Sequence, residues 1–217
     1  MKDWSGVSVH PYRQINPESA ANEYARLREA IARFKTSNDS ERLPIISGEW
    51  GYSSVWRGMN EETQAAMLAR QFLTNVANGI PISIWYDWRD DGVDPKEAEH
   101  HFGLVRNQYQ SGRAQVYEPK PAYLAAKTLT NQLNGYRFVE RMNIGSDNDY
   151  VLVFTNGSDR RMVAWTTSQT SRRVNVPATG RFTITNLKGE NAGTLAADNG
   201  SLLIELSSVP IYLAATN

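Results

Sequence analysis

The sequence contains no cysteine, which excludes disulfide frameworks, zinc–thiolate centres and thiol nucleophiles. It also lacks an excess of charge of either sign, because 23 Lys and Arg residues balance 23 Asp and Glu residues. A neutral chain has no electrostatic field that would draw it to nucleic acid or to an anionic membrane surface. We therefore expect no nucleic-acid partner and a neutral substrate.

Long apolar runs are absent as well. No stretch approaches the roughly 20 residues that a membrane-spanning helix needs, so we expect no membrane span. The start, Met1-Lys2-Asp3-Trp4, does not have the charged and apolar regions of a signal peptide, and we expect any secretion signal to lie upstream of this chain. Localisation stays open, with a secreted or periplasmic protein favoured if the full-length protein carries such a signal.

Three strand–helix units are predicted in the first part of the chain. Short apolar runs at 6–10, 43–47 and 81–86 are each followed by a segment with apolar residues spaced by three and four, typical of a helix with one buried face. Asn16-Pro17-Glu18 supplies an N-cap, a first-turn proline and an acid for the first helix. Its apolar stripe is Tyr24, Leu27, Ile31 and Phe34. The second helix is expected from about 60 to 78, and the third from Pro121 to Asn134.

The pattern changes after Gly135, where β-rich runs alternate with Gly, Asn, Asp or Pro turn signals. This predicts an antiparallel sandwich of about seven or eight strands at 136–217. The β-rich runs are 136–142, 150–155, 162–167, 172–176, 182–187, 202–206 and 211–214. Alternating strands and helices at 1–135 predict a parallel sheet covered by helices. A complete (β/α)8 barrel needs about 250 residues, so the expected fold is α/β plus all-β: a partial TIM (β/α) barrel of the last three units, then the sandwich.

Glu49 is the first candidate for chemistry, because it follows a buried strand and lies between Gly48 and Gly51. Catalytic groups of (β/α) barrels lie at the C-terminal ends of the strands. The alternative is that Glu49 caps the next loop or forms an ion pair.

Aromatic and imidazole side chains follow the other two strands. His10 and Tyr12 lie two residues apart, so both can face one side, with the imidazole toward a sugar hydroxyl and the phenol toward a carboxylate. Trp85 offers a flat face of the kind that stacks on a pyranose, and Trp50 and Trp88 are candidates to widen that platform. A structural histidine, a capping tyrosine and core tryptophans are the alternatives.

These residues resemble motifs of glycoside hydrolase clan A. Val9-His10-Pro11-Tyr12 is similar to the sixth-strand His-x-Tyr of family 5 cellulase-like enzymes, and Gly48-Glu49-Trp50-Gly51 to their seventh-strand nucleophile motif. Further resemblances to this clan lie in Ser83-Ile84-Trp85, in His101-Phe102-Gly103-Leu104-Val105 and in Lys120-Pro121-Ala122-Tyr123. The segment from Gly135 onward resembles the C-terminal sandwich attached to family 39 barrels.

The resemblance implies a retaining glycosidase acting on a β-linked poly- or oligosaccharide, without a cofactor. It implies that Glu49 is the nucleophile, that Tyr12 holds its carboxylate, that His10 binds a sugar hydroxyl and that Trp85 forms the floor of the subsite. The acid/base residue of this clan is the Glu of an Asn-Glu pair on the fourth strand, which would lie upstream of this chain. We therefore expect that the upstream half of the barrel is required and that the isolated chain is inactive or nearly so. Truncation would also leave the edges of a parallel sheet unpaired, so we expect the isolated barrel portion to be poorly soluble.

Other interpretations remain open from the residues alone. Asp87, Asp90, Asp91 and Glu99, after the third strand, are alternatives for a substitute acid or a cation site, although a solvated acidic loop is the expectation. His100 and His101 are adjacent and have no third ligand at a known spacing, so no metal is predicted. The main rival function is a non-catalytic carbohydrate-binding protein. The sandwich, whose clearest aromatic candidate is Trp165, is interpreted as structural rather than binding.

Overall fold

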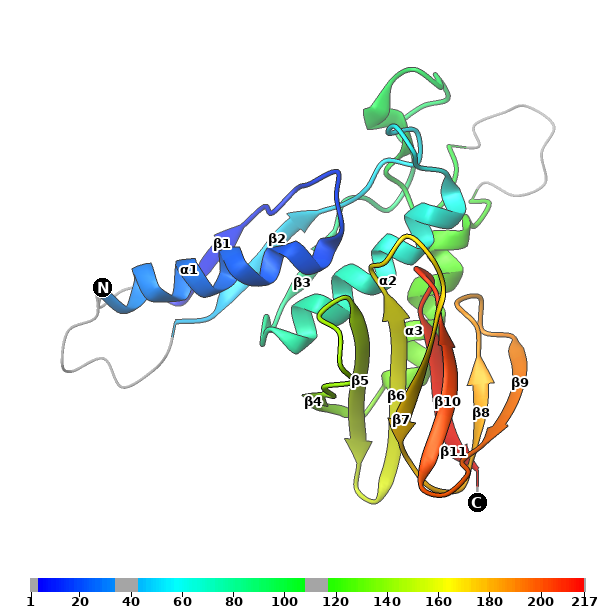
Figure 1. The fold of residues 1–217 in the computed structure, drawn as a ribbon. Helices are drawn as coiled ribbons and strands as arrows, with labels where there is room; N and C mark the ends of the chain where they lie inside the picture. Colours follow the sequence, from blue (N-terminus) through cyan, green and yellow to red (C-terminus); the bar gives the residue numbers. More distant parts are fainter. Residues whose placement is uncertain (1–3, 34–42, 108–116, 217) are drawn as a thin grey trace. The chain divides into compact units, whose positions relative to one another are not determined.

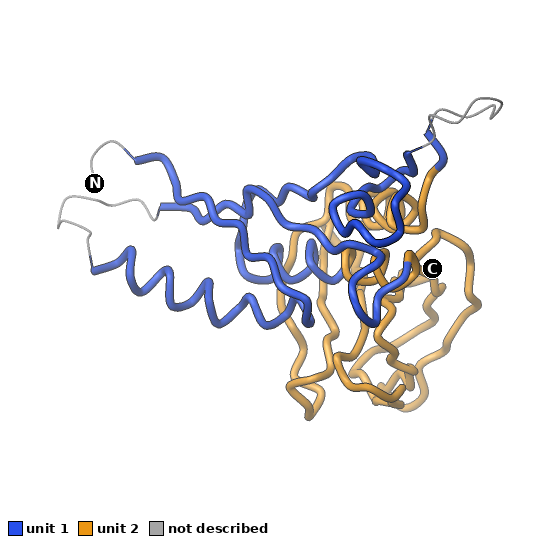
Figure 2. The backbone as a smooth tube through the Cα atoms, turned by 90° about the horizontal axis from the view of Figure 1, so that it is seen from above, with its two compact units in different colours: residues 1–60, 70–118 blue, residues 61–69, 119–217 orange. Residues whose placement is uncertain are grey.

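The computed structural model describes residues 4–33, 43–107 and 117–216. The chain forms two compact units, coloured in Figure 2: residues 1–60 with 70–118, and residues 61–69 with 119–217. The third helix therefore belongs to the second unit, although it precedes residue 135. A division into a catalytic domain at 1–135 and an accessory domain at 136–217 stays a prediction.

The first unit contains a parallel three-stranded sheet of order β1-β2-β3. Its strands are β1 (Val7–Val9), β2 (Ile45–Trp50) and β3 (Ser83–Trp85). Helix α1 (Ala20–Arg33) follows β1 through the short 3-10 helix η1 (Pro17–Ser19), and α2 (Glu61–Ala77) follows β2 (Figure 1). A second 3-10 helix, η2 (Ala98–His101), lies after β3. The predicted alternation of parallel strands and helices is thus present, while membership of a barrel stays a prediction.

A chain of buried polar contacts joins these helices to the sheet. The Tyr24 hydroxyl of α1 donates to Asn75 Oδ1 of α2 at 2.8 Å, and Asn75 Nδ2 donates to Ser83 Oγ of β3 at 2.7 Å. Tyr24 and Asn75 are 1% and 0% exposed. The apolar stripe predicted for α1 accounts for buried Tyr24 and Ile31, whereas Phe34 lies outside the described residues.

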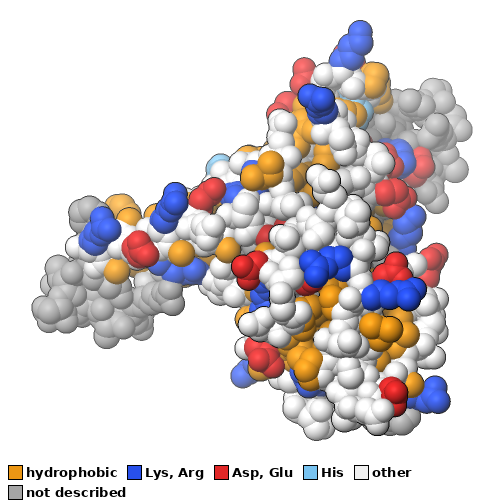
Figure 3. Space-filling model, viewed as in Figure 1, with side chains coloured by type: hydrophobic (Ala, Val, Ile, Leu, Met, Phe, Trp, Pro, Cys, Tyr) orange, Lys and Arg blue, Asp and Glu red, His pale blue; other side chains and the backbone are white. Residues whose placement is uncertain are grey.

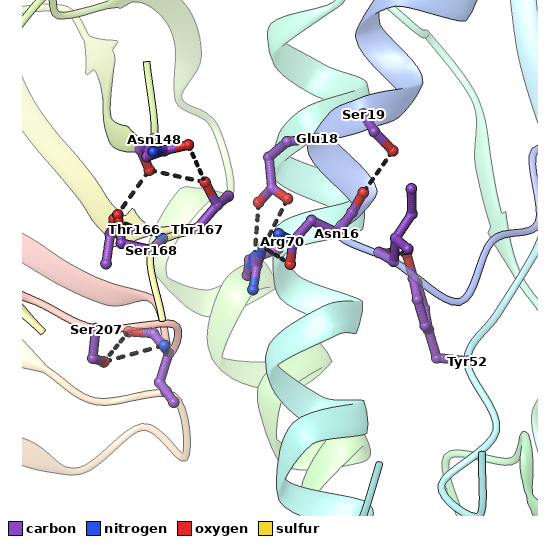
Figure 4. A network of polar contacts seen from close by, with 12 residues as sticks. Asn16, Glu18, Ser19, Tyr52, Arg70, Asn148, Thr166, Thr167, Ser168 and Ser207 are labelled. Atoms are coloured by element: carbon purple, nitrogen blue, oxygen red, sulfur yellow. Dashed lines mark hydrogen bonds and ion pairs between the residues drawn. The ribbon is translucent and has the colours of Figure 1, made fainter. Parts of the chain in front are cut away.

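The connection between β1 and α1 differs from the sequence prediction in one detail. Asn16 stands at the N-cap of η1, but its side chain makes no capping hydrogen bond. Its Oδ1 instead accepts from Arg70 Nη2 at 2.8 Å, and Arg70 also binds both carboxylate oxygens of Glu18 (Figure 4). Glu18 is therefore a buried ion-pair partner, not only an acid at the positive end of a helix dipole.

The second unit contains two antiparallel sheets. Their strands are β4 (Arg137–Arg141), β5 (Asp149–Asn156), β6 (Asp159–Thr166), β7 (Arg172–Pro177), β8 (Arg181–Thr185), β9 (Asn191–Ala196), β10 (Ser201–Leu206) and β11 (Ile211–Thr216). The larger sheet has the order β4-β5-β6-β11-β8-β9 and the smaller is β10-β7. Their facing side chains form one apolar core, which includes Val153, Met162, Ile204 and Leu213. Eight strands agree with the expected number, although β9 was not among the predicted runs.

Helix α3 (Pro121–Leu133) is connected to the larger sheet by side-chain contacts. Arg161 of β6 donates to the main-chain oxygen of Gln132, and the Gln132 side chain lies 3.4 Å from Thr185 Oγ1 of β8. Gly189 approaches the same helix so closely that an added Cβ would stand 2.9 Å from Thr128 Oγ1. Because of these contacts, α3 belongs to the same compact unit as the sandwich.

No helix in the described part of the chain is long and apolar enough to cross a membrane. On the face shown in Figure 3, Lys and Arg side chains alternate with Asp and Glu side chains, in keeping with the balanced composition.

Candidate active site

The glycines near Glu49, at the C-terminal end of β2, make two close contacts with neighbouring segments. A Cβ on Gly48 would lie 2.1 Å from Ser8 Oγ of β1, and one on Gly51 would lie 1.8 Å from the main-chain oxygen of Tyr86. Real Cβ atoms do not approach heavy atoms this closely, and at Gly51 the neighbour is main chain, which cannot rotate aside as the Ser8 hydroxyl can. Glycine on both sides thus lets the neighbouring segments pack against the strand that carries Glu49.

An irregularity in β2 sets the direction of the Glu49 side chain. Ile45 and Ser47 are buried, so strict alternation would place Glu49 on the buried face and Trp50 on the opposite one. The observed burial is reversed: Trp50 is fully buried and the Glu49 side chain is 39% exposed. The pairing of β2 with β3 shifts register between Ser47 and Trp50, which is the way a β-bulge re-aims side chains.

Tyr12 donates a hydrogen bond from its hydroxyl to Glu49 Oε1 at 2.9 Å. The other oxygen, Oε2, lies 4.0 Å from His10 Nδ1, which is too long for a hydrogen bond. Burial, the hydrogen bond to Glu49 and the charge of Glu49 raise the pKa of the Tyr12 phenol well above its usual range. The phenol therefore stays protonated and holds one carboxylate oxygen of Glu49.

Aromatic rings fix the position of Tyr12. Its ring meets those of Tyr86 and Phe102 edge to face, with centroids 6.4 Å and 6.2 Å away. Phe102 also packs edge to face against Tyr86 at 5.4 Å and Trp56 at 5.2 Å. Such pairs are worth about 0.5–1.5 kcal/mol beyond the burial of their area. The hydroxyl that binds Glu49 is thus attached to a well-supported ring.

The three predicted tryptophans have different environments. Trp85 is half-buried; its indole Nε1 donates to the Phe102 main-chain oxygen at 3.0 Å and its ring stacks on Tyr52 at 6.4 Å. Trp88 is 55% exposed, as a residue that contacts a ligand can be. Trp50 is the exception, because its buried ring lies below the Arg13 guanidinium at 5.3 Å. The prediction that Trp50 widens a substrate platform is wrong: it is a core residue.

The loop after β3 is a folded segment with its own hydrogen bonds. Asp90, 5% exposed, accepts from the Gly103 main-chain nitrogen at 2.8 Å and so has a structural role. His100 Nδ1 accepts from the Asp94 main-chain nitrogen, and His101 Nε2 lies 2.8 Å from the Asp94 main-chain oxygen. Among the described residues, no three His, Asp or Glu side chains are grouped as metal ligands.

Sequence reasoning missed several aromatic residues of this region: Tyr52, Trp56 and Tyr86. Each follows a strand that was itself predicted, since Tyr52 comes two residues after β2 and Tyr86 directly after β3. Their position after the C-terminal ends of parallel strands was the available signal.

The sequence and the fold were compared with those of known proteins. Neither a protein-family model nor a curated protein matches the sequence. Among solved structures, the chain is similar to a family 39 glycoside hydrolase from the gut symbiont Bacteroides cellulosilyticus WH2, with 28% identity and a TM-score of 0.79. That alignment covers 98% of this chain and 44% of the other.

Two more distant neighbours share the fold. A glucosidase from Croceicoccus marinus has 10% identity and a TM-score of 0.64, covering 98% of this chain and 55% of that one. A β-porphyranase of glycoside hydrolase family 86 from Bacteroides plebeius has 11% identity and a TM-score of 0.57, covering 98% and 42%. The fold is that of glycoside hydrolases. The chain spans about half the length of these proteins or less.

Proposed function

We propose that this chain is the C-terminal part of a retaining glycoside hydrolase that cleaves a β-linked poly- or oligosaccharide, with Glu49 as its nucleophile. In this proposal β1, β2 and β3 are the last three strands of a (β/α)8 barrel. The observation that carries it is the Glu49 carboxylate at the end of a parallel strand, with one oxygen held by Tyr12 and the other 4.0 Å from His10. The glycoside hydrolase fold of the neighbours supports it.

The proposed reaction has two steps. Glu49 Oε2 attacks the anomeric carbon while the bond from that carbon to the leaving oxygen breaks, and the leaving oxygen takes a proton from a second carboxyl group. Water then attacks the anomeric carbon of the glycosyl ester and gives its proton to that second carboxylate. Glu49 is released, and the sugar product has the same anomeric configuration as the substrate. Tyr12 orients the nucleophile, His10 binds a sugar hydroxyl, and Trp85 and Trp88 contact the sugar faces.

The second carboxyl group must stand about 5–5.5 Å from the nucleophile in a retaining enzyme. Asp90 is already bound to the Gly103 main chain, which argues against it in that role. We propose that the acid/base residue comes from an upstream half of the barrel, because the family 39 structure is matched over only 44% of its length. On this proposal, residues 1–217 by themselves are inactive.

The test is covalent trapping with 2-deoxy-2-fluoro-β-glycosyl fluorides of the gluco, galacto, manno and xylo series. Intact mass and peptide mapping of the full-length protein should show one added glycosyl group on Glu49, absent in Glu49→Gln. Glu29→Gln, which changes an exposed glutamate of α1, should label like the parent protein. Labelling of the 217-residue chain alone would overturn the requirement for an upstream half.

The rival function gives a different result in the same assay. A non-catalytic carbohydrate-binding protein would take no label with any reagent, and Glu49→Gln would leave its sugar binding unchanged. That pair of results would refute the assignment of Glu49 as a nucleophile.

A further inference from the structure

A second tyrosine–glutamate pair lies beside the first. The Tyr86 hydroxyl donates to Glu99 Oε2 at 3.4 Å, as the Tyr12 hydroxyl donates to Glu49. The two tyrosine rings meet edge to face at 6.4 Å, and both rest against Phe102. Glu99 is therefore linked to the candidate nucleophile through two adjacent tyrosines that share one aromatic support.

The main chain around Glu99 is tied to the segment that follows Glu49. Ser53 Oγ, fully buried, donates to the main-chain oxygen of Ala98 at 2.8 Å, and the Ser54 main-chain nitrogen donates to His101 at 3.1 Å. These contacts hold η2 on both sides of Glu99. The glutamate thus has a defined position with respect to β2, although 50 residues separate it from Glu49 in the sequence.

The Glu99 side chain is exposed and is available to a ligand. Within the described part of the chain, its carboxylate accepts one hydrogen bond, at Oε2 from Tyr86. Burial first, and then the charge of Glu99, raises the pKa of the Tyr86 phenol, which keeps its proton and continues to donate. The carboxylate oxygens of Glu99 retain unused lone pairs that face solvent.

We propose that Glu99, positioned by Tyr86, is a further substrate-binding residue of this site, which accepts hydrogen bonds from sugar hydroxyl groups and selects neutral sugars over anionic ones. The inference rests on the proposed glycosidase function. A carboxylate binds hydroxyl donors through charge-assisted hydrogen bonds, which are about twice as strong as neutral ones. The same charge repels a carboxylate or sulfate substituent on the sugar.

The experiment compares two trapping reagents on the full-length protein. One is the fastest-labelling neutral reagent among the gluco, galacto and manno 2-fluoroglycosyl fluorides, and the other is its uronic-acid counterpart. In Glu99→Gln, the concentration of neutral reagent that gives half-maximal labelling should rise about tenfold or more, with the maximal rate little changed. The rate with the uronic reagent, relative to the neutral one, should rise in the same variant.

Two further variants separate binding from structural support. Asp91→Asn removes a charge from the same loop and should leave both labelling properties unchanged. Tyr86→Phe keeps the Glu99 carboxylate but not the hydroxyl that holds it, and should weaken neutral labelling less than Glu99→Gln does. If Glu99→Gln lowers thermal stability, Tyr86→Phe still tests the proposal.

The possible failures are distinguishable. A parent protein labelled on Glu49 with unchanged selectivity in Glu99→Gln would overturn the role of Glu99 and leave the proposed function intact. Equal effects of Asp91→Asn and Glu99→Gln would also overturn it, because bulk charge would then account for the selectivity. A parent protein that takes no label overturns both proposals.

Discussion

Arg70→Met is expected to destabilise the first unit by about 3–5 kcal/mol, the cost of removing one partner from a buried ion pair. The Arg70 and Glu18 side chains are 1% and 4% exposed, and their two nitrogen–oxygen distances are 2.7 and 2.8 Å. Arg70 also donates to Asn16 at 2.8 Å (Figure 4). Methionine fills a similar volume but leaves the Glu18 carboxylate buried without its guanidinium.

This ion pair also holds the connection that follows His10 and Tyr12. Asn16 and Glu18 belong to that connection, and the Tyr52 hydroxyl donates to the Ile15 main-chain oxygen at 2.8 Å in the same stretch. Loss of Arg70 should therefore slow labelling of Glu49 as well as reduce stability. The double variant Glu18→Leu with Arg70→Met should recover most of the lost stability, because no buried charge then remains.

The assay is urea unfolding followed by tryptophan fluorescence and circular dichroism. Arg26→Met, which changes an exposed arginine of α1, should alter the free energy of unfolding by less than about 0.5 kcal/mol. A loss of under about 1 kcal/mol in Arg70→Met would show that the pair is solvated and would refute the reasoning.

Two further predictions concern packing and pH. Gly51→Ala should lower the free energy of unfolding by about 3 kcal/mol or more in the same urea assay, because its Cβ would meet the Tyr86 main-chain oxygen at 1.8 Å. Gly79→Ala is the control: its Cβ would meet open space, and only the positive φ of 63° should cost about 1 kcal/mol. Burial raises the pKa of Tyr24 to about 12, so the folded state holds this proton more tightly than the unfolded state. The resulting stability is complete below about pH 10 and is lost between about pH 10 and 12. Tyr24→Phe should make the loss shallower, by up to about 1.4 kcal/mol per pH unit in urea titrations at pH 9 to 12; an unchanged slope would contradict this.

The spacing of apolar residues predicted most of the secondary structure, because each helix or strand that buries one face needs apolar residues at regular intervals. The strands at 6–10, 43–47 and 81–86 appear as β1, β2 and β3, and the helices lie within two residues of the expected bounds where these were given. Strand β9 escaped because its sequence, Asn-Ala-Gly-Thr-Leu-Ala, has few residues that favour strands and is largely exposed. It is held by pairing with β8, a long-range contact that no local pattern reports.

The site residues that could be predicted are those that lie at strand ends or in motifs that resemble a known family. The hydrogen bond between Tyr12 and Glu49 joins two residues that the sequence had already paired, although their catalytic roles stay a proposal. The prediction for Trp50 failed because the pairing of β2 with β3 shifts register before Trp50. As a result, Trp50 faces the core and Glu49 faces outward, the reverse of what alternation along the strand predicts. The contact of Tyr86 with Glu99 depends on how the intervening loop folds back, and residue spacing carries no signal for that.

Two strands of the larger sheet, β5 and β6, are too buried to bind a sugar. Trp165, the aromatic candidate in the sandwich, is fully buried and stacks on Tyr150 at 4.9 Å. Along β5 and β6, consecutive residues on both faces of the sheet are buried, so these strands present no aromatic platform to solvent. For a carbohydrate-binding function we therefore look first to half-buried Trp85, at the end of β3, and to exposed Trp88 after it. The proposed hydrolase uses the same two residues, and Glu49→Gln separates the two functions because it removes a nucleophile while leaving the aromatic side chains in place.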